Sequence, residues 1–165
     1  MRVFTDMISG DEFFSDSFPH TLEFNDAGIE ARAKYITKGA ETVMIATDEE
    51  EEEQEGETVV DIQDKFQLNE VQGWSKAEFI QWAKAYMPKV VAKLTENGNE
   101  ERVPGFKKGA AAMVKFIASK WDEMQIFVGD KMDYEGAMCF AYQKNQEDDG
   151  PTFLFFKDGL KEMKY

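Results

Sequence analysis

Two adjacent carboxylates, Asp11 and Glu12, are the first side chains in this sequence whose types and spacing could do chemistry. They follow Ser9-Gly10, a composition typical of a turn. Carboxylates in a turn can cap backbone N–H groups or form salt bridges, and this structural role is one interpretation of the pair. A role in binding a partner is the alternative interpretation.

Two further acidic segments raise the question of calcium. Asp130–Gly136 superficially resembles the start of an EF-hand loop, but its third position is Met132, where an oxygen ligand is needed. No loop-closing glutamate follows at the required distance, so we interpret the segment as a solvated acidic turn. The denser run, Asp48–Glu57, predicts a mobile loop at about residues 47–57, because like charges repel and have nothing to bury. A calcium-attracting patch is the alternative interpretation of that run.

Catalytic chemistry finds little support. The chain has one histidine, His20, and one cysteine, Cys139, and no Gly-x-Ser-x-Gly, P-loop or Gly-x-Gly-x-x-Gly motif. Cys139 lies in the apolar run Ala137–Tyr142, which is typical of a buried and unreactive thiol. A single cysteine also excludes an internal disulfide framework and a cysteine-rich zinc site. We therefore predict a protein that is not an enzyme.

The composition limits the class of partner. The 165 residues include 33 acidic and 19 basic side chains, for a formal net charge of −14. Such a surface repels a polyanionic backbone, so we expect no nucleic-acid partner, and basic protein surfaces or divalent cations are the expected attractions. No apolar stretch reaches membrane-spanning length and no signal-peptide pattern opens the chain, which predicts a cytoplasmic protein.

The expected strands fall in three blocks, at about residues 1–46, 58–71 and 124–165. Runs such as Arg2–Thr5 and Thr21–Phe24 alternate apolar with polar residues, the period of a half-buried strand. In the middle block the candidates for the buried side are Val60, Ile62, Phe66 and Leu68. Strands from both ends of the chain most simply share one sheet.

Between the last two blocks the sequence predicts a helical hairpin at about residues 75–122. Ser75 and Glu78 form a capping box at its start, and Asn97–Asn99 interrupts the helical period. The expected buried faces are Phe79, Trp82, Ala83, Tyr86, Val90 and Leu94 in the first helix, and Phe106, Ala110, Met113, Val114, Ile117 and Trp121 in the second. Pro88 is expected to kink the first helix, and Pro104 or Gly105 to begin the second. The fold class is therefore α+β with an inserted helical hairpin, in a single domain spanning residues 1–165.

Both ends of the sequence resemble the translationally controlled tumour protein family. The N-terminal match rests on Asp6, Ile8–Ser9, Asp11–Glu12 and Phe14–Asp16. The C-terminal match rests on Phe127–Gly129, the Met132-Asp133-x-x-Gly136 turn, Gly150-Pro151 and the run Phe155–Leu160. The middle follows the family pattern at Val60–Ile62, Arg102–Phe106 and Gly109–Ala111.

The resemblance implies a twisted β-sheet "tent", related to the fold of a Rab-exchange chaperone, with a mobile acidic loop. It also implies that the acidic residue at Glu12 contacts a Ras-family small GTPase, and it makes tubulin and apoptosis regulators further partners. The chain departs from the family at about residues 38–57, where Met44–Glu49 replaces a stretch of the Ile-Gly-x-Asn-x-Ser-Ala-Glu type. The C-terminal cysteine through which some members dimerise is also absent, since Tyr165 stands there, so a monomer is expected.

Two functions follow as hypotheses. The first is a cytoplasmic, multi-partner binding protein that regulates growth through small GTPases, tubulin or survival factors, with chaperone-like behaviour and weak calcium binding. No cofactor is required for it, and some family members are exported without a signal peptide. The alternative is an acidic protein that binds or buffers calcium and does not modulate a GTPase.

Overall fold

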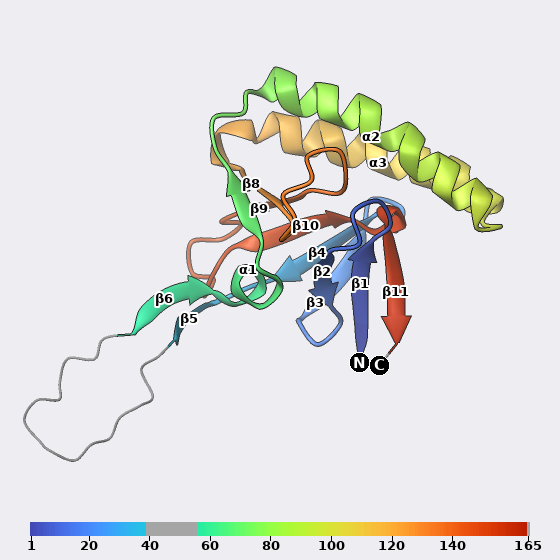
Figure 1. Ribbon diagram of the computed structural model, residues 1–165. Coiled ribbons are helices and arrows are strands. Elements are labelled where there is room, and N and C mark those ends of the chain that lie inside the picture. Colours follow the sequence, from blue (N-terminus) through green and yellow to red (C-terminus); the bar gives the residue numbers. More distant parts are fainter. Residues whose placement is uncertain (39–55, 165) are drawn as a thin grey trace, which may run out of the picture.

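The two ends of the chain lie side by side in one small sheet (Figure 1). The computed structural model describes residues 1–38 and 56–164. In this sheet β1 (Arg2–Asp6) pairs antiparallel with β2 (Glu12–Ser15) on one side and with β11 (Leu160–Lys164) on the other. The prediction that both ends of the chain share a sheet is therefore confirmed.

A larger antiparallel sheet of six strands forms the body of the molecule, in the order β3-β4-β10-β9-β8-β7. Its strands are β3 (His20–Glu23), β4 (Gly28–Arg32), β7 (Asn69–Val71), β8 (Gln125–Val128), β9 (Cys139–Tyr142) and β10 (Thr152–Phe156). Every residue of the central strands β9 and β10 is buried, because protein covers both faces of the sheet there. A separate ribbon pairs β5 (Tyr35–Lys38) with β6 (Glu57–Val60).

A hairpin of two long helices lies along one side of the sheets (Figure 1). Helix α2 (Lys76–Glu96) begins at the Ser75 N-cap, with both halves of the predicted capping box formed. Helix α3 (Val103–Ser119) follows a short 3₁₀ turn at Glu100–Arg102 and starts one residue before the predicted proline. Helix α2 continues through Pro88, as its apolar period predicted.

The apolar faces of this hairpin form the core with the large sheet. All six residues predicted for the first face are buried, as are Phe106, Ala110, Met113 and Ile117 of the second. Phe79 is fully buried and its ring contacts Trp82, Trp121 and Phe140, with centroid separations of 6.1, 5.2 and 5.2 Å. The α+β class with an inserted helical hairpin is therefore confirmed.

One part of the sequence prediction is wrong: the block 58–71 is not all strand. Helix α1 (Asp61–Phe66) lies between β6 and β7, and it ends at Gln67, whose φ of 55° is left-handed. Its two buried residues, Ile62 and Phe66, are four positions apart. That spacing fits one face of a strand and one face of a helix equally well, which is why alternation misled. The Asp61 carboxylate accepts the N–H of Ile62 at 2.7 Å and that of Lys34 at 3.0 Å, and so fixes the helix start.

Part of the prediction falls outside the described residues. This holds for residues 39–46 of the first block and for most of the acidic loop at 47–57, of which Glu57 begins β6. It also holds for Met44–Glu49, where the sequence departs from the family pattern.

Candidate partner-binding site

Asp6 is the buried centre of the turn that carries the predicted acidic pair. It ends β1, and only 2% of its surface is exposed. Its carboxylate accepts hydrogen bonds from the backbone N–H groups of Ile8 (3.1 Å), Ser9 (3.2 Å) and Ala137 (2.9 Å), and from the Ser9 hydroxyl (2.6 Å). Because a buried carboxylate needs such partners, Asp6 fixes the turn after β1 against a segment 131 residues away.

Asp11 joins the same turn to the loop after β8. It is 7% exposed, and its carboxylate accepts the backbone N–H of Lys131 at 3.0 Å. In return the Lys131 ammonium donates to the Ser9 carbonyl at 2.8 Å. Gly129 lies so close that a Cβ there would be 2.5 Å from the Asp11 carboxylate. Asp11 is thus placed as a structural group, the first of the two interpretations of the pair.

Glu12 is placed differently from its neighbour. It is the first residue of β2, opposite Thr5 and beside the irregularity at which Phe13 of β2 has no partner in β1, and it is exposed. Within residues 1–38 and 56–164 no hydrogen bond or ion pair engages its carboxylate. The two members of the predicted pair therefore differ: Asp11 is buried and hydrogen-bonded, whereas Glu12 is exposed on a strand next to the turn that Asp6 and Asp11 hold in place.

The loop at Asp130–Gly136 borders this turn and is itself fixed to α2. The buried Trp82 indole donates to the Gly136 carbonyl at 3.1 Å, and the Lys89 ammonium donates to the Glu135 carbonyl at 3.1 Å. Asp133 accepts the N–H of Glu135 at 2.9 Å, as expected of an acidic turn. Among the residues whose positions are described, no group of three or more His, Cys, Asp or Glu side chains could hold a metal ion.

The one cysteine of the sequence is buried, whereas its one histidine is exposed on an edge strand. Cys139 is fully buried in the middle of the large sheet, and this burial raises the pKa of its thiol well above the ordinary value. His20 lies in the edge strand β3, where its Nδ1 is 2.8 Å from the Phe18 carbonyl oxygen. A buried, protonated thiol is a poor nucleophile and also a poor candidate for an intermolecular disulfide.

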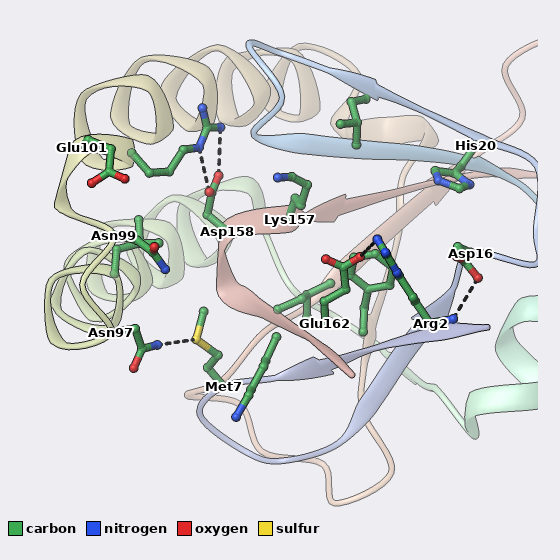
Figure 2. A pocket seen from close by; sticks show the side chains of 16 residues that line it. Arg2, Met7, Asp16, His20, Asn97, Asn99, Glu101, Lys157, Asp158 and Glu162 are labelled. Carbon is green, nitrogen blue, oxygen red and sulfur yellow. Dashed lines mark hydrogen bonds and ion pairs between the residues drawn. The ribbon is translucent and has the colours of Figure 1, made fainter. Parts of the chain in front are cut away.

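A cleft of about 840 Å³ lies elsewhere, where the small sheet and β3 meet the end of the helical hairpin (Figure 2). One wall is fixed by Arg102, which binds Asp158 through two hydrogen bonds of 2.8 and 3.0 Å. The Asp158 side chain is only 5% exposed, and its hydrogen bond raises the pKa of the Arg102 guanidinium. This pair joins the hairpin to the turn between β10 and β11.

We expect Arg102→Ala to lower the free energy of unfolding by about 2 kcal/mol, because it leaves a buried carboxylate without its cation. Arg2→Ala is the matched control: Arg2 of β1 also pairs with an acid, Glu162 of the neighbouring strand β11, but their side chains are 50% and 46% exposed. Its loss should cost less than about 1 kcal/mol. Urea denaturation of both variants measures the difference, and equal losses would contradict the assignment.

Sequence reasoning identified Asp11 and Glu12 but missed the residues that support them. Asp6 was visible only as part of a family pattern, because its partner Ala137 is 131 positions away. Lys131 was assigned to a solvated turn, whereas its backbone N–H and its ammonium both hold the Ser9–Asp11 segment.

None of the described helices is apolar and long enough to span a bilayer.

Comparison with known proteins gives one consistent result. Residues 1–161 match the family model described as translationally controlled tumour protein. The translationally-controlled tumor protein homolog 1 of Dictyostelium discoideum is 40% identical over 177 residues, covering all of both chains. Among solved structures, p23fyp of Schizosaccharomyces pombe, a translationally controlled tumor-associated protein, matches over the whole of both chains with a TM-score of 0.80 and 30% identity. The Caenorhabditis elegans protein matches with a TM-score of 0.68 and 21% identity over all of this chain and 99% of its own, a likeness of fold.

Proposed function

The chain belongs to the translationally controlled tumour protein family, and from that premise we propose that it binds a Ras-family small GTPase through the surface around Glu12. Membership supports a regulatory protein of this family's type. The single observation that carries the proposal is the state of Glu12, an exposed carboxylate without a described partner, on a turn that buried Asp6 and Asp11 hold rigid.

The proposed mechanism uses charge at a prepared position. A small GTPase orders its nucleotide through basic side chains and a magnesium ion. When the nucleotide is absent, a carboxylate on a rigid turn can bind the basic surface that the nucleotide would otherwise occupy. Because the turn is already ordered, binding costs little conformational entropy. The acidic chain as a whole, at −14, favours encounter with a basic surface.

Nuclear magnetic resonance titration of the labelled protein with a nucleotide-free Ras-family GTPase tests this proposal. We expect saturable shifts in Ser9–Ser15 and in the neighbouring loop that contains Lys131. Glu12→Ala should weaken binding by roughly tenfold or more, the loss expected for a charged contact at an interface.

Glu147→Ala is the matched control, because Glu147 is an exposed acid of the β9–β10 connection that makes no hydrogen bond or ion pair with a described residue. The affinity of the Glu147→Ala variant for the GTPase should equal that of the wild-type protein. An unchanged affinity for Glu12→Ala would exclude the role of Glu12. Binding that shifts only distant residues would exclude this surface as a whole.

We further propose weak calcium binding as a secondary property, with tubulin and apoptosis regulators as additional protein partners in the cytoplasm. Support for calcium comes from the sequence, where eight of the ten residues Asp48–Glu57 are acidic. A calcium titration at low salt separates saturable binding from general screening. Saturable binding without any GTPase interaction would favour the alternative, an acidic calcium-buffering protein.

A further inference from the structure

From its charges and its walls, we infer that the cleft beside the hairpin binds an acidic peptide segment of a partner protein. The cleft lies in the corner between β1, β3, β11 and the end of α2, and its volume of about 840 Å³ is within the range of ligand sites in proteins. Glu12 is not among its lining residues, so the inference stands apart from the proposed function.

The floor of the cleft is apolar. Leu94 and Leu160 are 4% and 8% exposed, and the half-buried Phe4 packs on Phe14 with ring centroids 5.6 Å apart. Leu22, on the β3 wall, keeps 44% of its surface exposed. A large apolar side chain of a ligand would cover Leu22 and Phe4, which water covers in the free protein.

The acids that line the cleft differ in the partners they have. Two of the acids, Asp158 and Glu162, are neutralised by Arg102 and Arg2. Asp16 accepts the backbone N–H of Arg2 at 3.0 Å. Figure 2 shows Glu101 on the hairpin side of the cleft, away from His20 on the opposite wall.

Two of the four cations that line the cleft, Arg2 and Arg102, are held in ion pairs, and the other two are lysines. Neither the Lys157 nor the Lys161 ammonium forms an ion pair or hydrogen bond within the described parts of the chain. Figure 2 places Lys157 between the hairpin and His20, whose ring packs edge-on against Phe14 at 5.2 Å. The ammonium groups of Lys157 and Lys161 favour a ligand that carries carboxylates.

The walls favour an extended peptide over a small molecule. Strands β3 and β11 are each the outermost strand of a sheet, and each lines the cleft through two or more residues. An outermost strand has backbone groups on one side that no neighbouring strand pairs, and extended peptides bind proteins by adding to such edges. The net charge of the chain acts against this only at long range, since charges beyond about 8 Å are largely screened at physiological salt.

The test uses an acetylated and amidated Glu-Glu-Leu-Glu-Glu peptide, with Gln-Gln-Leu-Gln-Gln as its neutral counterpart. We expect the acidic peptide to produce saturable amide shifts in His20–Glu23 and Leu160–Lys164, with an affinity that falls as salt is added. The double variant Lys157→Gln/Lys161→Gln should weaken binding by roughly tenfold or more. Lys115→Gln is the matched control, since Lys115 is an exposed lysine on α3 that lies outside the cleft, and it should leave the affinity unchanged.

Three results would overturn the inference. One is the absence of saturable shifts at millimolar acidic peptide in the full-length protein. Another is equal binding of the neutral peptide, which would show that the lysines do not select the ligand. The third is inorganic phosphate producing the same shifts and displacing the peptide at equal concentration, which would identify a site for free anions. Circular dichroism of the double variant excludes misfolding as the cause of any loss.

Discussion

Asp6→Ala is expected to lower the free energy of unfolding by about 3 to 4 kcal/mol, because it leaves several buried donors without an acceptor. Four donors converge on this carboxylate, at distances between 2.6 and 3.2 Å. Water cannot readily replace the carboxylate, since Asp6 is 2% exposed and Ala137 is 4% exposed. Urea denaturation followed by circular dichroism measures the loss.

Asp16→Ala is the matched control for Asp6, an aspartate removed from the same region of the small sheet. Asp16 is exposed and accepts one backbone hydrogen bond, from Arg2. Its removal should cost less than about 1 kcal/mol, because water can satisfy the donor that it leaves. If Asp6→Ala also costs less than this, the turn after β1 does not depend on its carboxylate.

The Asp6 variant also separates structure from binding at the proposed GTPase surface. Loss of the Asp6 carboxylate should broaden or shift the resonances of Ser9 and Asp11. Ser9 donates to Asp6 through its N–H and its hydroxyl, and the N–H of Asp11 donates to that hydroxyl. Glu12→Ala should leave those resonances in place while it weakens binding. Glu12→Ala therefore removes the acid and keeps the turn ordered, whereas Asp6→Ala keeps the acid and removes the order of the turn.

The parts of the fold that the sequence predicted are those determined by local physical signals. The capping box at Ser75 and Glu78 satisfies backbone donors within four residues, and the helical period after it has no competing interpretation. Helix α1 was missed because its short apolar pattern fits two periods at once. The block 124–165 was not divided before β11, although Asp158-Gly159 is a turn signal, because four of the five residues of β11 are exposed and give no apolar alternation.

The candidate site was only half predictable, for a different physical reason. Adjacent acids after Ser9-Gly10 identified the turn, but the sequence could not say which carboxylate is buried. That choice depends on Lys131, which lies 120 positions from Asp11. The turn that carries the pair depends in addition on Ala137, which lies 131 positions from Asp6. The cleft was not predictable at all, since β1, β3, α2 and β11 each contribute lining residues and meet only in the folded chain.

Gly109→Ala is expected to destabilise the protein by about 3 kcal/mol, although alanine favours a helix by about 1 kcal/mol over glycine. A Cβ at Gly109 in α3 would overlap the backbone carbonyl oxygen of Phe24 and lie 2.7 Å from the Ala27 Cβ. These neighbours cannot easily move: Phe24 is held at a φ of 56°, and Ala27 is fully buried with its carbonyl bound to the N–H of Lys157 at 2.8 Å. The added methyl must therefore push α3 away from the β3–β4 turn.

Gly105→Ala distinguishes this steric account from a general effect of substitution in the same helix. A Cβ at Gly105 would lie 2.8 Å from the Arg102 Nη1, which makes no hydrogen bond to a described residue, so this nitrogen can give by a few tenths of an ångström while Nε and Nη2 keep their bonds to Asp158. The gain in helix propensity then offsets most of the cost, and the change in stability should stay within about 1 kcal/mol. Equal melting temperatures for Gly109→Ala and Gly105→Ala would mean that α3 can move away from the β3–β4 turn without a loss of stability. A large drop for Gly109→Ala alone would establish that the close approach of α3 to Phe24 fixes the hairpin on the sheet, where it also forms one wall of the cleft.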